Sequence, residues 1–535
     1  MVKGQVPPNW AWAKGAGGSG DDVSNGIATD AAGNTYITGG FSSPTISFGA
    51  TTLTNNGGGN VYITKYDANG NVIWAKSAGG IYSDHGSSIA IDAAGNTYIT
   101  GGFSSPTITY GATTLTNNSN NIYSDIFIAK YDVNGNVLWV KSSGGTSDDE
   151  GESIALDAAG NAYITGYFQS PTITFGATTL TNIGNYNTFI TKYDTNGNVI
   201  WAKSSDGSTG VQSFSIASDA SGNTTITGFF YNASVTFGTT TLTNNGLSDI
   251  FIVKYDTNGN VIWAKSSGGT SDDWGYSIVM DAAGNAYITG EFGSSAVIFG
   301  ATTLTNNGGG DILIAKYDTN GNEVWAKSAG GSGDEQGYSI ATDLSGSTYI
   351  TGYFRSPAIT FGATTLTNNA FYDLVIAKYD TNGNVVWASS IGGSSNDYGS
   401  SIATNATGYT CVTGYFLSSS ITFGATTITN ADITGGSYDV FIAKLNATTG
   451  IAEMENNAAI VISPNPFSNY TTITLPSTQQ PATIILTDIL GKEIRTIPHV
   501  RDRQVVIEKG EMKPGIYFLT LTTQAGVENR KIVVE

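Results

Sequence analysis

The chain has 535 residues, of which 69 are glycine and only 12% are charged, and its formal net charge is −19. The acidity belongs to residues 1–450, where 15 Lys and Arg face 33 Asp and Glu, whereas residues 451–535 hold 8 against 9. This balance argues against nucleic acid or an anionic membrane as a partner, because both attract basic surfaces. No apolar run approaches the roughly 18 residues of a membrane span. The composition favours short strands and tight turns over helices.

One segment of about 62 residues is repeated seven times. Each repeat contains a strand-like run with a tryptophan followed by Ala or Val, and successive tryptophans lie 62 residues apart, with one step of 65. A period of this length with several strand-like runs is typical of propellers and repeat arrays. The tryptophans are Trp12, Trp74, Trp139, Trp201, Trp263, Trp325 and Trp387.

The repeat that starts at Ser153 predicts four strands, at 153–157, 162–168, 188–194 and 199–203. They are rich in β-branched and aromatic residues and are bounded by Gly, Asn and Asp clusters. Two connections are tight turns, in which an aspartate can accept backbone N–H groups and a glycine can adopt positive φ. A longer excursion connects the second strand to the third. Four antiparallel strands are the anatomy of a propeller blade.

The phase of the repeats predicts a closed fold. The strand around Trp12 precedes any complete repeat, and the last third strand, which holds Lys444, has no tryptophan strand after it. The N-terminal strand can therefore complete the seventh blade and remove the open edges of a linear array. We predict an all-β chain: a closed seven-bladed β-propeller over 1–449, a linker over 450–459 and a small β-sandwich over 460–535. The alternative is a string of small β-sandwich modules.

Closure would place the acidic loops before each first strand on one face, the top face, together with the long excursions. Carboxylates there could hold Ca²⁺ through oxygen ligands. The alternative is solvated turns whose aspartates cap nearby N–H groups. The Asp-x-Asn-Gly-Asn turns lack the remaining ligands of an EF-hand loop, so they are predicted to be hairpins. The calcium candidates are Asp22, Asp149, Asp273 and Asp334.

The second strand varies from repeat to repeat directly after its Thr-Gly pair. Because alternate residues of a strand share a face, these side chains could form one ring near the top face, with a mixed aromatic and polar character suited to glycans. The alternative is drift at exposed positions. The candidate ligand-binding residues are Tyr167, Gln169, Tyr231, Glu291, Tyr353 and Arg355.

No set of catalytic residues stands out from the repeats. The sequence holds two histidines, His85 and His499, and one cysteine, Cys411, which replaces a repeated tyrosine and is predicted to be a small core residue. Acidic pairs that could serve a glycosidase occur in almost every repeat. We therefore predict no catalytic residues and a protein that is not an enzyme, with a polysaccharide hydrolase or lyase as an alternative.

The C-terminal residues carry four motifs in order, Ser463-Pro-Asn-Pro466, Asp488-Ile-Leu-Gly-Lys492, Lys513-Pro-Gly-Ile-Tyr-Phe518 and Lys531-Ile-Val-Val-Glu535. Together they resemble the type A C-terminal sorting domain of the type IX secretion system of Bacteroidetes-type bacteria. The resemblance implies export by the type IX machinery and then surface attachment or release. Met1 to Asn9 lack the apolar stretch of a signal peptide, which we expect to be missing from this chain. The motif residues are Pro464, Asn465, Pro466, Gly491, Lys492, Gly515, Tyr517 and Lys531.

The repeats resemble the seven-bladed propeller repeat family called SBBP, through Asp-x-x-Gly-Asn-x-Tyr-Ile-Thr-Gly and Phe-Ile-Ala-Lys-Tyr-Asp-x-Asn-Gly-Asn-Val-Ile-Trp-Ala-Lys. This resemblance implies a fold and not an activity, because propellers host many functions. We predict a secreted or surface-displayed monomer that binds an extracellular carbohydrate or surface protein in an adhesive role. The alternative is a structural surface or matrix protein without a discrete ligand. No cofactor is predicted beyond the candidate calcium.

Overall fold

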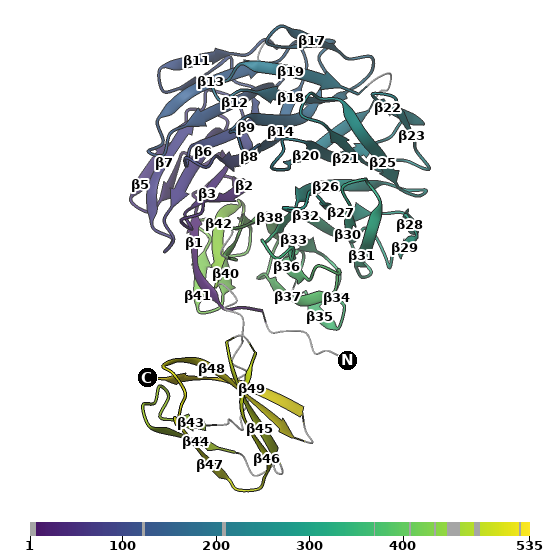
Figure 1. Cartoon of the computed structure of the whole chain (residues 1–535). Helices are drawn as coiled ribbons and strands as arrows, with labels where there is room; N and C mark the ends of the chain where they lie inside the picture. Colours follow the sequence, from purple (N-terminus) through teal and green to yellow (C-terminus); the bar gives the residue numbers. More distant parts are fainter. Residues whose placement is uncertain are drawn as a thin grey trace. The chain divides into compact units, whose positions relative to one another are not determined.

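The computed structural model of the chain contains two compact units, residues 1–447 and 448–535, called here the N-terminal unit and the C-terminal unit. The structure describes residues 7–119, 123–205, 210–368, 370–405, 408–432, 435–446, 461–475, 482–489, 491–523 and 526–535. The predicted linker, 450–459, lies outside them. These described residues form strands and turns without a helix (Figure 1).

Seven four-stranded antiparallel sheets that resemble propeller blades occur in the described part of the N-terminal unit. In each sheet an inner strand pairs with a second strand, the second with a third and the third with an outer strand. The inner strands of neighbouring sheets lie side by side around a central opening (Figure 1).

The inner strands are β2 (Asp22–Thr29), β8 (Asp84–Ile91), β14 (Asp149–Leu156), β20 (Val211–Ser218), β26 (Asp273–Met280), β32 (Glu335–Thr342) and β38 (Asp397–Thr404). The second strands are β3 (Thr35–Phe41), β9 (Thr97–Phe103), β15 (Ala162–Phe168), β21 (Thr224–Phe230), β27 (Ala286–Phe292), β33 (Thr348–Phe354) and β39 (Thr410–Phe416). The third strands are β6 (Asn60–Tyr66), β12 (Asp125–Tyr131), β18 (Asn187–Tyr193), β24 (Asp249–Tyr255), β30 (Asp311–Tyr317), β36 (Asp373–Tyr379) and β42 (Asp439–Leu445). The outer strands are β1 (Trp10–Ala16), β7 (Val72–Ala78), β13 (Val137–Ser143), β19 (Val199–Ser204), β25 (Val261–Ser267), β31 (Glu323–Ala329) and β37 (Val385–Ile391).

The N-terminal strand β1 is the outer strand of the sheet that also contains β38, β39 and β42. It pairs antiparallel with β42, so that Trp12 lies opposite Lys444. On the inner side of the same sheet, β38 lies beside β2 of the first repeat. The strand pairing that the phase of the repeats predicts for Trp12 is therefore present.

The tight turn between the third and outer strands of a sheet packs against the tryptophan of the preceding sheet. Asp67 Oδ1 accepts a hydrogen bond from the Asn71 backbone N at 2.8 Å, and Gly70 adopts a φ of 79°. The Trp12 ring of the preceding sheet lies against this turn, where a Cβ on Gly70 would come within 2.7 Å of a ring atom. Trp12 Nε1 donates to the Ala68 carbonyl at 3.1 Å. Glycine is therefore required here for its conformation and for the close approach of the indole.

Each long excursion, predicted from the sequence to lie on the top face, forms a two-stranded hairpin on the outer side of its sheet. Ile46 and Phe48 are buried, and the Phe48 ring centroid lies 4.9 Å from that of Tyr62. At the tip, a Cβ on Gly49 would lie 3.3 Å from Val72 at the start of β7. Burial of the alternating apolar residues explains this position. The hairpin strands are β4 (Thr45–Phe48), β5 (Thr51–Thr54), β10 (Thr107–Tyr110), β11 (Thr113–Thr116), β16 (Thr172–Phe175), β17 (Thr178–Thr181), β22 (Ser234–Phe237), β23 (Thr240–Thr243), β28 (Ala296–Phe299), β29 (Thr302–Thr305), β34 (Ala358–Phe361), β35 (Thr364–Thr367), β40 (Ser420–Phe423) and β41 (Thr426–Thr429).

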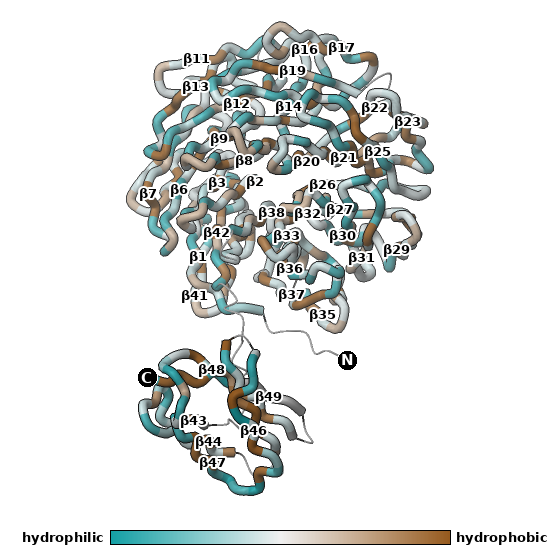
Figure 2. The backbone as a smooth tube through the Cα atoms, in the orientation of Figure 1, coloured by the Kyte–Doolittle hydropathy of each residue, from teal (hydrophilic) through white to brown (hydrophobic). Residues whose placement is uncertain are grey.

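The apolar core lies between the sheets. The second and third strands are covered on both faces, so that every residue of β3 and of β6 is buried. Figure 2 shows apolar and polar segments interleaved through this unit rather than separated into two zones. The inner strands differ, because buried and half-exposed residues alternate along their first halves. One face of each inner strand is therefore free to line the central opening.

The C-terminal unit contains two sheets in its described residues, β43-β44-β47 and β46-β45-β48-β49. Both contribute to one apolar cluster, which includes Ile473, Leu486 and Leu519. The strands are β43 (Val461–Ser463), β44 (Tyr470–Thr474), β45 (Ala482–Asp488), β46 (Glu493–Val500), β47 (Gln504–Glu508), β48 (Gly515–Thr523) and β49 (Gly526–Val534).

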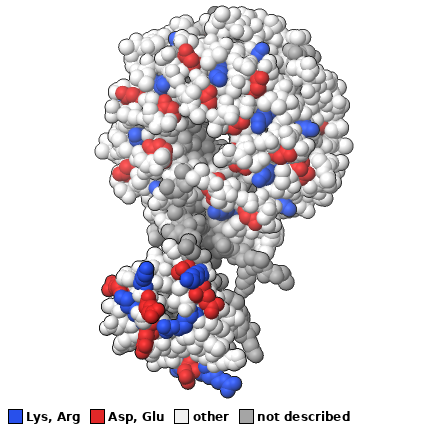
Figure 3. Space-filling model, in the orientation of Figure 1, with Lys and Arg blue, Asp and Glu red and all other residues white. Residues whose placement is uncertain are grey.

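Charged side chains are sparse on the visible face of the N-terminal unit and dense on that of the C-terminal unit (Figure 3). Across the described chain, we find no helix with the length and apolar character that a membrane span requires.

Candidate ligand-binding site

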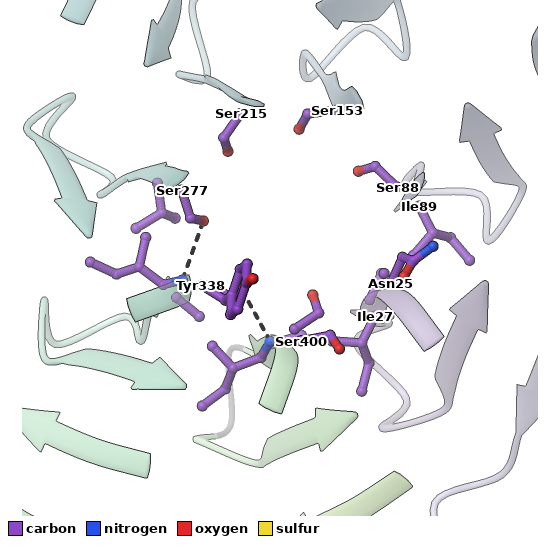
Figure 4. A pocket seen from close by; sticks show the side chains of 18 of the residues that line it. Asn25, Ile27, Ser88, Ile89, Ser153, Ser215, Ser277, Tyr338 and Ser400 are labelled. Carbon is purple, nitrogen blue, oxygen red and sulfur yellow. Dashed lines mark hydrogen bonds between the residues drawn. The ribbon is translucent and has the colours of Figure 1, made fainter. Parts of the chain in front are cut away.

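The inner strands surround a cavity of about 1090 Å³. Figure 4 shows Ser88, Ser153, Ser215 and Ser277 around it, with the Tyr338 ring near its centre. The serines also tie the sheets together: Ser277 Oγ accepts the Ile340 backbone N–H at 3.3 Å, and the same bond recurs at four other junctions. The end of the cavity where the inner strands begin is called the mouth.

One side of the mouth is aromatic. The cavity is lined there by Phe214, Trp274, Tyr276, Tyr338 and Tyr415, called here the aromatic wall. These side chains come from β20, β26, β32 and β39. Their rings are held by one another, with centroid distances of 5.5 Å for Phe214–Tyr276, 6.0 Å for Trp274–Tyr276 and 5.1 Å for Tyr276–Tyr338. Such contacts fix the ring orientations and present a broad apolar surface with polar edges.

The other side of the mouth is polar and acidic. His85 and Glu152 line the cavity from β8 and β14. His85 Nε2 lies 3.6 Å from Glu150 Oε2, and Gln212 Nε2 donates to Glu152 Oε1 at 3.5 Å. We call His85, Glu150 and Glu152 the acidic wall. Gly102 makes room for it, because a Cβ at that position would lie 2.0 Å from Glu150 Oε2.

Burial governs the protonation of the acidic wall. It raises the pKa of Glu150 to about 8 and that of Glu152 to about 7; the charges of Asp148 and Asp149 add to the first shift, and that of Glu150 adds to the second. Burial lowers the pKa of His85, against the opposing effect of the nearby carboxylates. Near neutral pH the two glutamates therefore change charge while the imidazole is neutral.

Three of the predicted ligand-binding residues lie near β15 and β21. The Tyr186 ring lies between Tyr167 and Tyr231, with centroid distances of 5.8 and 5.7 Å. The Gln169 backbone N donates to Asp149 Oδ1 at 3.1 Å. These residues form a group beside the acidic wall.

The other three lie with the aromatic wall. Glu291 Oε1 accepts the Tyr276 hydroxyl at 3.1 Å. Tyr353 is buried, and its ring centroid lies 5.5 Å from that of Tyr338, so it packs against the aromatic wall. Arg355 is exposed and pairs with Asp334 at 3.7 Å. The six residues thus form two groups, and their role in ligand binding stays a prediction.

Three of the four calcium candidates are hydrogen-bonded to a serine in a neighbouring loop. Asp22, Asp149 and Asp273 are fully buried, and each carboxylate accepts a serine hydroxyl at 2.7 Å. Burial raises the pKa of Asp22 and Asp149 to about 6. Asp334 does not belong with them, because the matching residue of its repeat is Glu335, which bonds Ser356 at 2.6 Å. No group of three or more His, Cys, Asp or Glu in the described ranges is arranged to hold a metal, so calcium binding stays a prediction.

Most of the aromatic wall comes from the inner strands, whereas the predicted ligand-binding residues come from the second strands and the residues that follow them. The residue directly before the repeated serine of the inner strand, a position that Gly26 takes in the first repeat, also varies: in chain order it is Asn25, Ser87, Glu152, Phe214, Tyr276, Tyr338 and Ser400. Three consecutive aromatics in this series were the available signal.

In the C-terminal unit, the sorting motifs meet. Asn465 Nδ2 donates to the Lys531 carbonyl at 3.0 Å, and Asn465 Oδ1 accepts the Val533 N–H at 2.8 Å. The side chain of Asn465 thus extends the ladder of β49. Gly491 adopts a φ of 81° in the turn that precedes Lys492, and Tyr517 donates to the Lys513 carbonyl at 2.9 Å. Pro464 directly follows β43, Pro466 lies between β43 and β44, and Gly515 is the first residue of β48.

Asn465→Ala is expected to destabilise the C-terminal unit by about 1–2 kcal/mol, because it leaves two backbone groups of β49 without their partner. Differential scanning calorimetry of the full chain would resolve the transition of this unit. Asn469→Ala is the matched control, since Asn469 is exposed and only its backbone carbonyl accepts a hydrogen bond, from Lys509. Equal melting of both variants would contradict the role assigned to Asn465.

Residues 461–535 match the family described as the secretion system C-terminal sorting domain. The C-terminal unit is therefore a type IX sorting domain, as its motifs predict, and it marks the chain for secretion and attachment at the cell surface. The match covers this unit alone.

The repeats have more distant relatives. The chain is 26% identical over 483 residues to an uncharacterized WD repeat-containing protein of Acanthamoeba polyphaga mimivirus. The matched region covers 74% of this chain and 34% of that protein. The chain thus spans about a third of that relative's length. Two solved structures share 9% identity and a TM-score of 0.36: Sqt1 from Chaetomium thermophilum covers 78% of this chain and 84% of its own, and YCF48 bound to D1 peptide covers 83% and 99%. The SBBP resemblance stays a prediction.

Proposed function

We propose that the N-terminal unit is a closed seven-bladed β-propeller that binds an extracellular carbohydrate at the mouth of its central cavity. The protein reaches the cell surface through the type IX machinery, which its C-terminal unit engages. It acts there as a monomeric adhesive module and not as an enzyme. The observation that carries the proposal is the aromatic wall, which lies across the mouth from a polar, acidic side.

Closure is supported by the two contacts that join the first and last repeats. The strand β1 completes the sheet of β42, and β2 lies beside β38. In a closed ring each inner strand lies between two neighbouring inner strands, so that the short edges of the sheets are protected and the cavity keeps its shape without a ligand.

Carbohydrate is favoured over other ligands by the chemistry of the mouth. A sugar ring presents an apolar face of C–H groups and an edge of hydroxyls. The rings of Trp274, Tyr276 and Tyr338 supply an apolar surface of matching size, while the Trp274 N–H donates to Ser248 Oγ at 2.7 Å and the Tyr276 hydroxyl donates to Glu291. Glu152 and Gln212 supply acceptors and donors on the other side. No positive charge among the cavity-lining residues would attract nucleic acid.

The test is binding of the full chain to a glycan array, followed by titration with the best glycan. Trp274→Ala and Tyr338→Ala are each expected to weaken binding by about tenfold or more, the loss typical of one stacked ring. Tyr470→Ala is the matched control, because this exposed tyrosine belongs to the C-terminal unit. Circular dichroism would confirm that each variant keeps its fold.

Two other outcomes would replace the proposal. Absence of binding to any glycan would favour a structural surface or matrix protein. Turnover of a polysaccharide that Glu152→Gln abolishes would favour a hydrolase, since paired carboxyl groups with separated pKa values are the machinery of glycoside cleavage.

A further inference from the structure

Positive charge is nearly absent from the mouth. Apart from Arg355, the Lys and Arg of residues 7–446 occupy two repeated positions, one on the third strands and one on the outer strands. The third-strand lysines turn to the opposite end of the sheet, as Lys130 does over the Tyr98 ring at 4.7 Å and beside Asp92 at 3.8 Å. Arg355 is paired with Asp334. The lining of the cavity contains neither Lys nor Arg.

The acidic wall lacks a counter-charge. Glu150 Oε2 is buried and has no hydrogen-bond partner among the described residues; the Ser124 hydroxyl, which lowers the pKa of this carboxyl, brings no charge, and burial lowers the pKa of the neighbouring His85. The titratable groups around Glu152 are Glu150 on β14, His85 on β8 and Tyr167 on β15, while Gln212 of β20 donates a hydrogen bond. A buried carboxylate without a cation is costly, and a ligand that brings one recovers that energy.

The opposite wall also favours a cation. The faces of Trp274, Tyr276 and Tyr338 carry negative quadrupole density, which attracts an ammonium group within about 6 Å. The same rings stack on the apolar face of a sugar. A ligand that has both a sugar ring and an ammonium group therefore satisfies both walls at once.

We infer that the mouth selects a glycan with free amino groups, in which the sugar stacks on the aromatic wall and the ammonium group meets Glu150 and Glu152. This inference rests on the proposed carbohydrate binding and names the class of sugar.

The test compares two oligosaccharides of equal length, one of glucosamine and one of N-acetylglucosamine, by calorimetric titration of the full chain at pH 7. The acetyl group removes the charge and leaves the ring in place. We expect the glucosamine oligomer to bind about tenfold more tightly, the gain typical of one new charge pair. Glu152→Gln should reduce this ratio to about threefold or less, while binding of the acetylated oligomer is retained.

The matched control is Glu323→Gln, which removes the same charge from β31 and keeps an acceptor for the Thr302 hydroxyl, now bonded at 2.9 Å. This variant should keep the full preference for the amine. In the unchanged chain, affinity for the glucosamine oligomer should rise from pH 5 towards neutral pH and fall again at higher pH, where the sugar amine loses its proton. The rise follows because the ammonium favours the ionised forms of Glu152 and of Glu150, whose ionisation the nearby Asp148 and Asp149 oppose, and their protons are released on binding. Titrations in two buffers of different ionisation enthalpy would measure that release.

Each result has a distinct reading. Equal binding of the two oligomers, or a preference that Glu152→Gln leaves unchanged, would overturn the inference and leave carbohydrate binding standing. Binding of polylysine in place of either oligomer would overturn it in favour of a basic peptide. Failure to bind any glycan would overturn the inference and the proposed function together.

Discussion

Deletion of residues 1–16 is expected to unfold the N-terminal unit or to convert it to aggregates. The deletion removes the outer strand β1 and leaves β42 as an unpaired edge, which promotes association between chains. It also removes the Trp12 ring from the Gly70 turn and the Trp10 ring from Phe423, 4.9 Å away. Loss of a packed tryptophan alone costs about 3–5 kcal/mol, and a whole domain is stable by only about 5–15 kcal/mol.

A rearranged chain gives the matched control for this deletion. Residues 10–16 can be inserted between positions 445 and 446, joined to the end of β42 by a copy of the 380–384 turn, in a chain that lacks residues 1–16. The ring then closes through the normal third-to-outer connection. Thermal unfolding and size-exclusion chromatography should show a folded monomer for this chain and neither property for the simple deletion. A deletion variant that melts like the full chain would contradict closure.

Asp249→Asn is expected to stabilise the protein at pH 8. Asp249 is fully buried at the start of β24, and its Oδ1 has no hydrogen-bond partner among the described residues. Burial, together with the neighbouring Asp273 carboxylate, raises its pKa to about 6. A carboxyl whose pKa is higher in the folded state loses stability as pH rises from the unfolded value, about 3.9, through the folded one. The full penalty is present at pH 8, so that its removal should yield about 1–3 kcal/mol.

The sequence contains a precedent for this exchange. Two repeats already carry asparagine at the same position, Asn60 and Asn187, and Asn60 Nδ2 reaches the Thr54 carbonyl at 3.4 Å. Urea unfolding at pH 4 and pH 8 would measure the effect, which should vanish at the lower pH. Asp256→Asn is the control, because hydrogen bonds lower the pKa of this exposed turn aspartate. Asp256→Asn should not raise the free energy of unfolding at pH 8. An Asp249→Asn variant that is less stable than the unchanged chain at pH 8 would contradict the assigned cause.

The local rules of strands and turns predict most of the fold. Four strands per repeat, the Asp67-type turns and the pairing of β1 follow from hydrophobic runs, glycine positions and the phase of the tryptophans. The hairpin of Ile46 and Phe48 could not be placed in the same way, because its position depends on a groove between two sheets that only the assembled structure creates. A short Thr-rich run does not reveal which surface will cover it.

The candidate site was less accessible to sequence reasoning. Tyr167, Glu291 and Tyr353 do lie near the mouth, because alternation along a strand is a local rule. Tyr338 and Trp274 line the same cavity from the inner strands of two different sheets. They come together only because the sheets are arranged around that cavity. The calcium candidate Asp334 differs from the other three, because a shift of one residue in its loop exchanges an exposed carboxylate for a buried one, Glu335.

The ladder register of the inner and second strands has an evolutionary consequence. Glu150 lies opposite Tyr167, and Trp274 lies opposite Glu291, so that two of the sheets each place a cross-strand pair of large side chains near the mouth. The serines that join the sheets occupy other positions of the same strands. Mutation can therefore rewrite the recognition surface one sheet at a time while the scaffold stays intact. A duplicated segment with this division of labour can acquire new ligands by substitution alone, without any loop being lengthened.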